Sequence, residues 1–586
     1  MISKTDIMHF FDLEASAFKK SWESTMALPL HERIRRRRAI ERVMLICEEP
    51  SSEQGYVSIR VSAEVNLSDF KEGDCLLLHK ENESPGIHCT LASFVGDTEI
   101  VLDIYGRPDL SACYNVPLLL DRDCIDLRDK VYNKFLARLP ADSDFWSGNV
   151  LNSGKSPVFS DVAKYEEELQ DTIDNFHLSL KPKQREAVLK CMSADDYYLV
   201  QGPPGTGKSF VLSLVILEEL LYFKHKVIVT GPNHKAINNT LESVAKIIPN
   251  YIGHLVKVGQ SYNAPTIEVE QDGERLKIFN VSKSSWCQLG DTCIDYYEGP
   301  LVIGLTPHSL YTSRGGELTY CDTIIIDEAG QMTIPLALMG MIKAKKVIFA
   351  GDYKQLPPIV SSQEITGEMR ISAFQKLISD SNCTMLDTSF RMCEQICMFI
   401  SELFYDGKVV PEVKGHGMSV LCPDQQYSYE SPIIINDVED GGEQTSDKEA
   451  SFIAELVSSY IDTYHLSPLE IAVLSPFRAQ TANIRRHLKK SRALDRQTCQ
   501  QIAVDTVDKM QGQEREVIIY SMTAGDADYI ADMAEFLFNP NKLNVAFSRA
   551  KFKLIIVGNM KRLEKADTAD YPHIRRMMES KFVKYL

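Results

Sequence analysis

Tyr197 to Ile216 read YYLVQGPPGTGKSFVLSLVI, and this stretch decides the fold of the centre of the chain. A short apolar run leads into the pattern GxxxxGK[ST], from Gly202 to Ser209, and a helix-compatible apolar run follows it. Glycines in such a loop let successive backbone N–H groups face phosphate oxygens, and the positive end of the helix adds to the attraction. The stretch predicts a nucleotide-binding loop in which Lys208 neutralises the β- and γ-phosphates and Ser209 offers a hydroxyl to Mg²⁺.

A second apolar run ends in two adjacent carboxylates. TIIIDEAGQ, from Thr323 to Gln331, puts Asp327 and Glu328 directly after three isoleucines. Mg²⁺ in phosphate sites takes few protein carboxylates and completes its shell with phosphate and water. We therefore expect Asp327 to hold the metal and Glu328 to polarise the water that attacks the γ-phosphate. The alternative is that Glu328 only caps the segment that follows.

Short apolar runs alternate with helical segments over residues 181–586. Such runs are typical of parallel strands that are buried on both faces of a sheet. They predict two α/β domains with a cleft between them, over 181–383 and 384–586, and an insertion in the first domain at about 250–299. The first sheet would contain YYLV, KVIVT, LVIGL, TIIID and KVIFAGD, and the second TMLDTSF, PIIIN, IAVLSP, EVIIYS and KLIIVGN.

Two arginines of the second predicted domain are candidates for the charge that phosphoryl transfer needs. Arg391 lies in LDTSFRM and Arg549 in LNVAFSRAKF, both in apolar surroundings where an unpaired guanidinium is costly. We expect both to reach the γ-phosphate from across the cleft, where they would stabilise the transition state. Each of them is also consistent with a simple ion pair between the domains.

Residues 1–180 carry no enzymatic motif. An opening helical stretch leads to segments that alternate apolar and polar residues, with turn signals between them. This pattern predicts a small antiparallel barrel at about 42–122, followed by charged helices. The basic run ERIRRRRAIER, Glu32 to Arg42, is either a nucleic-acid patch or, as we favour, a solvated helix face.

The composition limits the kinds of partner. The 586 residues include 64 Lys and Arg against 81 Asp and Glu, a net charge of −17. This balance argues against coating nucleic acid by charge, so a polyanion must be bound by a local groove or by backbone amides. The 14 cysteines include no CxxC pair and no His/Cys cluster at zinc-site spacing. We expect them to be unpaired and mostly buried, which fits a reducing compartment. Without a leader pattern or an apolar membrane span, we expect a cytoplasmic protein, nuclear in a eukaryote, with no membrane partner.

The ordered motifs over residues 181–560 resemble those of the superfamily-1 helicases. The resemblance is to the B branch, which includes the nonsense-mediated-decay helicase and the immunoglobulin-μ-binding and Dna-two-type enzymes. The blocks that carry it are KPKQREAV, GPPGTGKS, TGPNHKAINNTL, VIGLTPHSL, DEAGQ, GDYKQLPPIV, SFRM, VDTVDKMQGQERE and NVAFSRA. LPLHERIRRRRAIERV with the barrel after it resembles the stalk helix and barrel of the same family.

The resemblance implies an α/β fold of two RecA-like P-loop parallel-sheet domains in tandem, with an N-terminal helical stalk and a small β-barrel accessory domain. It implies a monomeric ATP hydrolase that uses Mg²⁺ to move 5′ to 3′ on single-stranded DNA or RNA and to unwind strands. Two alternatives stay open. One is a nucleic-acid-stimulated ATPase that remodels protein–nucleic acid complexes without unwinding, and the other is a P-loop switch that gates a protein partner.

The resemblance also implies roles for individual residues. Gln184 would read the adenine edge, Phe390 would stack on the base, and Gln355 would sense the γ-phosphate. The catalytic set is Lys208, Glu328, Gln355, Arg391 and Arg549, and the metal ligands are Ser209 and Asp327. The nucleotide-binding set is Gln184, Gly202, Pro203, Pro204, Gly205, Thr206, Gly207, Lys208, Ser209, Phe210, Phe390, Gly512 and Glu514. The nucleic-acid set is Pro232, Asn233, His234, Thr306, Pro476, Phe477, Arg478 and Thr506.

Two positions depart from the family pattern, and a third has two interpretations. Phe390 stands where many relatives have tyrosine, which keeps stacking and loses a hydroxyl. SMTAG, Ser521 to Gly525, lacks an arginine that often follows in the family, which affects a local contact and no catalytic role. Phe477 is as consistent with a core aromatic as with a nucleic-acid contact.

Overall fold

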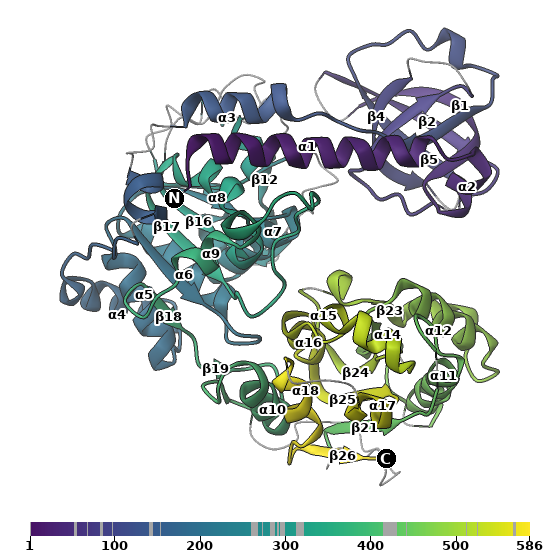
Figure 1. The fold of residues 1–586 in the computed structure, drawn as a ribbon. Helices are drawn as coiled ribbons and strands as arrows, with labels where there is room; N and C mark the ends of the chain where they lie inside the picture. The colour runs from purple at the N-terminus through teal and green to yellow at the C-terminus, as the bar shows by residue number, and fades with distance from the viewer. Residues whose placement is uncertain are drawn as a thin grey trace.

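The chain forms a barrel and two α/β domains, which Figure 1 shows as three separate bodies. The computed structural model describes residues 2–51, 55–66, 68–81, 86–95, 98–139, 145–152, 154–259, 268–271, 274–281, 288–289, 292–293, 299–311, 321–413, 431–440, 442–463, 465–510, 512–523, 525–565 and 570–586. This architecture confirms the predicted fold class. Among the helices so described, none is long and apolar enough to cross a membrane.

Six antiparallel strands close into the barrel in the order β1-β2-β5-β4-β3-β6. Alternate residues of each strand point inward and are buried, as in Val43, Ile59 and Leu102, because side chains alternate between the two faces of a strand. The strands are β1 (Ala39–Pro50), β2 (Tyr56–Ala63), β3 (Cys75–His79), β4 (Ile87–Val95), β5 (Glu99–Tyr105) and β6 (Leu118–Arg122).

The long helix α1 (Lys4–Met26) joins the barrel to the first α/β domain, as Figure 1 shows. Its beginning packs into the core of that domain, where the ring of Phe11 stacks on Tyr132 at a centroid distance of 4.1 Å. At its other end the indole of Trp22 donates to the carbonyl oxygen of Arg122 in the barrel at 2.7 Å. The helix α3 (Asn133–Arg138) packs in the same core as α1, and α4 (Glu166–Asn175) packs in a separate core of the first domain.

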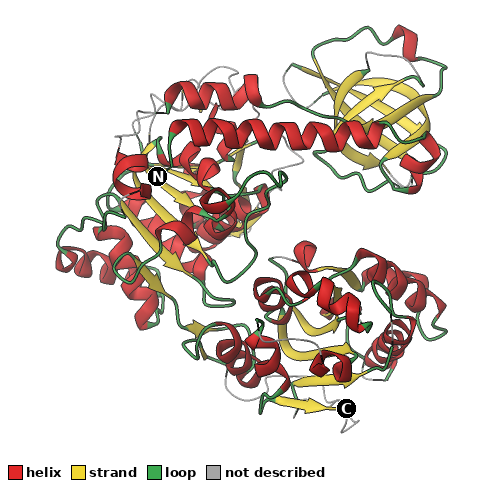
Figure 2. Ribbon diagram, in the orientation of Figure 1, coloured by secondary structure: helices red, strands yellow, loops and turns green. Residues whose placement is uncertain are grey.

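The first α/β domain contains an eight-stranded parallel sheet in the order β12-β9-β15-β8-β16-β17-β7-β18. Helices lie on both faces of it (Figure 2), which explains why its strands are mostly apolar and buried. The strands are β7 (Tyr197–Gln201), β8 (Lys226–Thr230), β9 (Leu255–Val258), β12 (Phe279–Val281), β15 (Leu301–Gly304), β16 (Cys321–Ile326), β17 (Ala344–Gly351) and β18 (Cys383–Met385). The helices are α5 (Pro182–Ser193), α6 (Lys208–Leu221), α7 (His234–Ile247), α8 (Ile334–Met341) and α9 (Ala373–Leu377).

The second α/β domain contains a six-stranded parallel sheet in the order β23-β22-β24-β25-β21-β26. Its strands are β21 (Ile433–Asp437), β22 (Ile471–Ser475), β23 (Ala503–Thr506), β24 (Arg515–Ser521), β25 (Ala550–Gly558) and β26 (Val583–Tyr585). Its helices are α10 (Glu394–Phe404), α11 (Asp447–Asp462), α12 (Arg478–Lys490), α13 (Arg496–Gln501), α14 (Ala527–Asp532), α15 (Ala534–Leu537), α16 (Pro540–Phe547), α17 (Met560–Lys565) and α18 (Pro572–Met578).

The structure corrects two of the sequence assignments. TMLDTSF does not open the second sheet, because β18 pairs with β7 at the edge of the first sheet and β19 (Thr388–Ser389) pairs only with β20 (Val410–Pro411). LPLHERIRRRR is not the stalk, because only α2 (Leu30–Arg35) forms there and α1 is the connecting helix.

The predicted insertion at about 250–299 is only partly an insertion, because β9 and β12 of the first sheet fall within it. Residues 260–267, 272–273, 282–287, 290–291 and 294–298 lie outside the described residues. Two short hairpins are described in the same region. They are β10 (Glu268–Gln271) with β11 (Glu274–Lys277), and β13 (Gln288–Leu289) with β14 (Thr292–Cys293).

Candidate active site

The loop between β7 and α6 has the shape of a phosphate-binding loop. Gly205 and Gly207 lie at φ angles of +75° and +81°, in the left-handed region that glycine adopts with little strain. A Cβ atom on Gly205 would lie 2.5 Å from the Cβ of Arg391, so the position also requires glycine for space. α6 begins at Lys208 and is 14 residues long, and its positive end, with Ser209 in the first turn, faces this loop.

Two carboxylates meet Lys208 at the end of β16. The ammonium group of Lys208 pairs with Asp327 and lies 3.0 Å from Oε1 of Glu328. Burial alone would lower the pKa of Lys208, but the two carboxylates raise it overall above its ordinary value. Thr240 on α7 donates to Oδ2 of Asp327 at 2.7 Å, and Gln331 donates to Glu328 at 3.1 Å. Both acids are thus held beside the phosphate-binding loop.

The two carboxylates differ in exposure and in backbone strain. The side chain of Asp327 is 3% exposed and that of Glu328 is 32% exposed. Glu328 has a φ of +53°, which is uncommon outside glycine and accumulates at functional sites. One carboxylate is therefore fixed within the protein as a metal ligand should be, and the other is open to water.

Ser209 and Asp327 fit a Mg²⁺ ion that is completed by phosphate and water. Within the described part of the chain, no group of three or more His, Cys, Asp and Glu side chains could hold a metal ion by itself. Mg²⁺ bound with substrate phosphates needs only one or two protein ligands. The donor set beside Lys208 is of that kind.

The order of the strands brings these groups together. β16, β17 and β7 are neighbours in the first sheet, and the segments with Glu328, Gln355 and the phosphate-binding loop follow their carboxyl ends. In parallel sheets the carboxyl ends of strands form one edge, where ligands bind. Gly330 packs so closely against the next strand end that a Cβ there would lie 2.7 Å from the carbonyl oxygen of Asp352.

The second domain brings two guanidinium groups to the same place. Nε of Arg391 donates to Oε2 of Glu514 at 2.5 Å, while the amide of Phe390 donates to the carbonyl oxygen of Gly205 at 2.8 Å. Arg391 thus touches the phosphate-binding loop and the segment before β24 together. Part of its charge is used in an ion pair with Glu514, which lies within the second domain and is not the ion pair between domains that the alternative interpretation predicted.

Arg549 lies almost wholly within the protein, directly before β25. Its side chain donates to the carbonyl oxygen of Gln513 at 3.3 Å, and its Nε, which is buried, has no hydrogen-bond partner. Burial, together with repulsion from Arg391, lowers the pKa of Arg549 to about 9, although Glu328 across the cleft acts in the opposite direction. A buried cation of this kind, with Arg391 as a second cation near it, favours an anion at this place.

Three residues of the predicted nucleotide-binding set have distinct surroundings. Gln184 is buried, accepts from the amide of Lys181 at 3.0 Å, and donates to the carbonyl oxygen of Thr206 at 3.1 Å. Its amide is therefore already tied to the phosphate-binding loop. The ring of Phe390 is 43% exposed, as a base-stacking surface requires. Gly512, at a φ of +72°, is exposed.

A hydrogen-bond network that the sequence analysis missed links the first sheet to α16. Gln355, the predicted γ-phosphate sensor, donates to Oδ2 of Asp352 at 3.0 Å, and Tyr405 donates to the same oxygen at 2.5 Å. Asn544 donates to the Tyr405 hydroxyl at 2.8 Å and to the carbonyl oxygen of Lys354 at 2.7 Å. Asp352 is buried, which raises its pKa. No local pattern points to Tyr405, since its partners are distant in the sequence.

The predicted nucleic-acid residues follow the carboxyl ends of other strands. Pro232, Asn233 and His234 come after β8, and Thr306 comes after β15, which is the neighbour of β8. In the second sheet, Pro476 and Arg478 follow β22, and Thr506 ends the adjacent strand β23. Pro232, Asn233, His234, Thr306, Pro476 and Arg478 are partly or fully exposed, whereas Thr506 is buried. The two sheets each keep these residues on neighbouring strands.

Phe477 is a correction to the sequence analysis. Its side chain is 7% exposed and lies in the core of the second domain, where it packs against Tyr529 and Phe536 at centroid distances of 6.1 and 5.5 Å. A ring in this position does not stack on a base. The physical reason is that the residue at the start of an amphipathic helix can face the sheet as readily as the solvent.

Two family models match the α/β part of the chain. Both are described as an AAA domain, and they cover residues 179–284 with 302–363 and residues 369–561. The matches thus fall on the first and the second sheet domains.

Several curated proteins are similar to the same part of the chain. The mouse protein DNA replication ATP-dependent helicase/nuclease DNA2 is 27% identical over 430 residues, which cover 68% of this chain and 38% of the mouse protein. DNA polymerase alpha-associated DNA helicase A of Schizosaccharomyces pombe is 28% identical over 450 residues, which cover 67% of this chain and 66% of the yeast protein. Regulator of nonsense transcripts 1 of Dictyostelium discoideum is 29% identical over 437 residues, which cover 67% of this chain and 32% of the Dictyostelium protein. The chain spans less than two thirds of each of these relatives.

Proposed function

We propose that this chain, which belongs to the superfamily-1 helicases in the branch of regulator of nonsense transcripts 1 and the DNA2 helicase/nucleases, hydrolyses ATP to move along single-stranded nucleic acid. Movement is 5′ to 3′, and it drives strand unwinding. The strand is DNA or RNA.

One observation carries the proposal. The phosphate-binding loop of the first sheet and two buried or half-buried guanidinium groups of the second domain converge on one place. The backbone contact between Phe390 and Gly205 and the unpartnered Nε of Arg549 define it. A triphosphate there neutralises charges from both domains, so its hydrolysis changes how strongly they attract each other.

The chemistry follows from the positions of the side chains. Lys208 exchanges its pairing with Asp327 and Glu328 for the β- and γ-phosphate oxygens. Glu328 then orients a water and accepts its proton as the water oxygen bonds to the γ-phosphorus, and the bond from that phosphorus to the bridging oxygen of ADP breaks. Arg391 and Arg549 stabilise the charge that develops. Ser209 and Asp327 would hold a Mg²⁺ ion, which would supply charge neutralisation for the phosphate groups.

The network behind Gln355 transmits the change to the second sheet. Gln355 reorients when the γ-phosphate leaves, and it shares Asp352 with Tyr405, which is bonded to Asn544 on α16. The same helix ends just before Arg549. Loss of the γ-phosphate therefore changes the environment of α16 in two ways, through the hydrogen bonds that end at Asn544 and through the charge of Arg549.

Movement requires that the two domains hold the strand alternately. Residues after β8 and β15 hold it in the first domain, and Pro476, Arg478 and Thr506 hold it in the second. Contacts to backbone and sugar fit a chain with a net charge of −17, because local contacts rather than overall charge then supply the affinity.

ATP turnover measured with matched single-stranded DNA and RNA oligomers tests the proposal. We expect one or both to raise kcat, and a duplex with a 5′ tail to be unwound in preference to one with a 3′ tail. Glu328→Gln should abolish turnover and keep ATP binding. Stimulation without unwinding would favour the remodelling ATPase, and turnover indifferent to both strands would favour the P-loop switch and refute the motor.

A further inference from the structure

A groove lined mainly by basic side chains lies between the barrel and α12. Its volume is about 980 Å³, and ten of its 15 lining residues are Lys or Arg against two Asp. The basic residues are Arg37, Arg38, Lys71, Arg122, Arg478, Arg485, Arg486, Lys489, Lys490 and Lys509. This charge is unusual in a chain with 64 basic against 81 acidic residues.

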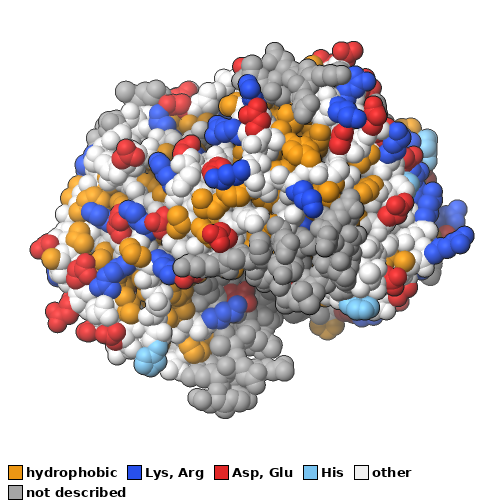
Figure 3. Space-filling view, turned by 90° about the horizontal axis from the view of Figure 1, so that it is seen from below, with side chains coloured by type: hydrophobic (Ala, Val, Ile, Leu, Met, Phe, Trp, Pro, Cys, Tyr) orange, Lys and Arg blue, Asp and Glu red, His pale blue; other side chains and the backbone are white. Residues whose placement is uncertain are grey.

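On the face of the molecule seen from below, the charges are mixed. Figure 3 shows the face seen from below, where Lys and Arg side chains are interspersed with Asp and Glu over most of the described surface. A local concentration of one sign within an acidic protein attracts ligands of the opposite sign to that place alone.

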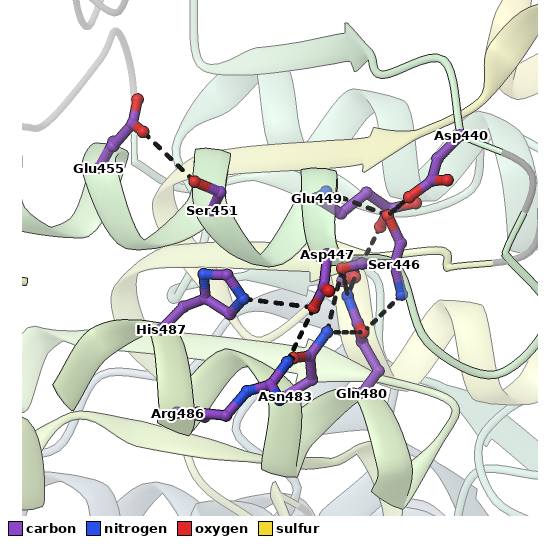
Figure 4. Close-up of polar contacts among 11 residues, drawn as sticks. Asp440, Ser446, Asp447, Glu449, Ser451, Glu455, Gln480, Asn483, Arg486 and His487 are labelled. Carbon is purple, nitrogen blue, oxygen red and sulfur yellow. Dashed lines mark hydrogen bonds and ion pairs between the residues drawn. The ribbon is translucent and has the colours of Figure 1, made fainter. Parts of the chain in front are cut away.

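The helix side of the groove is built to be rigid. Gln480 on α12 accepts from the amide of Ser446 at 2.9 Å and donates to its carbonyl oxygen at 3.1 Å, which ties α12 to the start of α11. Figure 4 shows these contacts, with Asn483 beside them and Arg486 and His487 directed at Asp447. The buried face of α12 is thereby fixed, and its opposite face presents basic residues to the groove.

Part of the positive charge in the groove lacks compensation. Arg37 and Lys509 lie 3.7 and 3.4 Å from Asp69 and Asp505. For Arg38, Lys489 and Lys490, by contrast, the described residues provide no carboxylate within ion-pair distance. Cations of this kind raise the local potential and cost stability when no anion neutralises them.

We propose that this groove binds the phosphodiester backbone of nucleic acid that extends past Arg478. The proposal rests on the proposed function, since Arg478 belongs to the strand-holding set and also lines the groove. The groove reads charge and not base identity, because its one aromatic lining residue, Phe70, is buried under the guanidinium of Arg122. The backbone comes either from the single strand that continues beyond the motor or from a duplex attached to it.

The test compares two groove variants with a charge-matched control. Arg38→Ala/Lys489→Ala/Lys490→Ala removes three cations, and Lys489→Glu/Lys490→Glu reverses two on α12 without touching the barrel. Lys246→Ala/Lys345→Ala/Lys561→Ala removes three exposed cations outside the groove. Kd is measured against salt for an 8-nucleotide strand, a 30-nucleotide strand, a blunt duplex and a tailed duplex, with thermal unfolding as the check of folding.

Each lost phosphate contact lowers the salt slope by about 0.7 for a single strand and about 0.9 for a duplex. We therefore expect the triple groove variant to lower the slope by about 2 on the 30-nucleotide strand or about 3 on a duplex. The ligand that shows the loss identifies the source of the backbone. The control should match the wild type on all four ligands.

The groove and the motor fail in different ways. Groove variants that fold and keep the wild-type Kd and salt slope on every ligand overturn the groove proposal alone. A wild-type chain whose ATP turnover responds to no strand overturns the proposed function, whatever the groove binds.

Discussion

Replacing Arg549 by methionine should separate catalysis from stability. The guanidinium is almost fully buried, its Nε has no partner, and burial with repulsion from Arg391 lowers its pKa to about 9. The charge is therefore held at a cost to the folded protein. Methionine keeps an unbranched stem of similar length and removes that cost.

The substitution should lower kcat but leave stability unchanged or raise it. A guanidinium that meets the transferred phosphoryl group contributes about 10³- to 10⁵-fold to kcat. Since Arg391 remains, we expect the lower end, a loss of about 10³-fold, which equals about 4 kcal/mol. Apolar replacement of a buried ion pair is neutral or stabilising by about 1–4 kcal/mol, and we expect the same sign for this buried charge without an ion-pair partner. For a domain of this size each kcal/mol shifts Tm by roughly 2–4 °C.

The assay combines strand-stimulated ATP turnover with thermal unfolding of the nucleotide-free protein. Arg575→Met, which changes an exposed arginine of α18, is the matched control and should leave both unchanged. An Arg549→Met variant that keeps normal kcat would refute the role in catalysis. A fall in Tm of several degrees would refute the argument that the buried charge is a cost.

Three further outcomes are expected. Tyr405→Phe removes the hydroxyl that bonds to both Asp352 and Asn544. The stimulation of ATP turnover by a nucleic-acid strand should therefore fall, while turnover without a strand stays within a few-fold of the wild-type rate. Unchanged stimulation would contradict a role for the network. Burial raises the pKa of Glu449 to about 8, against 4.5 in the unfolded chain, so the stability that the protonated carboxyl contributes is complete below pH 4.5 and is lost as pH rises to 8. The Tm of Glu449→Gln should therefore rise relative to that of the wild type between pH 6 and pH 9. A difference in Tm that stays constant over this range would disprove the argument. Phe477→Ala should lower the free energy of unfolding by about 3–5 kcal/mol, measured by denaturant unfolding. A variant as stable as the wild type would contradict the placement of Phe477 in the core.

The parts of the site that the sequence predicted are those that a short stretch specifies. Eight residues from Gly202 to Ser209 contain the loop, its positive-φ glycines and the helix start, so their order alone dictates the geometry. Asp327 and Glu328 follow a buried strand and therefore had to reach the edge of the sheet where that loop lies.

The parts that the sequence did not predict depend on contacts between distant segments. Tyr405 matters through Asp352, 53 residues away, and Asn544, 139 residues away, and none of the three stands in a pattern that names the others. TMLDTSF was assigned to the wrong sheet because a three-residue strand pairs according to where the chain passes and not according to sequence order. Phe477 was ambiguous because periodicity does not distinguish a core aromatic from an exposed one at the start of a helix.

The anchoring of α1 at both of its ends has a mechanical consequence. Phe11 fixes this helix of 23 residues, about 34 Å long, in the core of the first domain, and Trp22 fixes the barrel to it. The barrel must then travel as a rigid extension of the first domain, while α12 travels with the second. On the proposed function, each movement of one domain relative to the other would change the width of the groove between the barrel and α12. The affinity of the groove for a polyanion would then rise and fall once in each cycle of ATP hydrolysis.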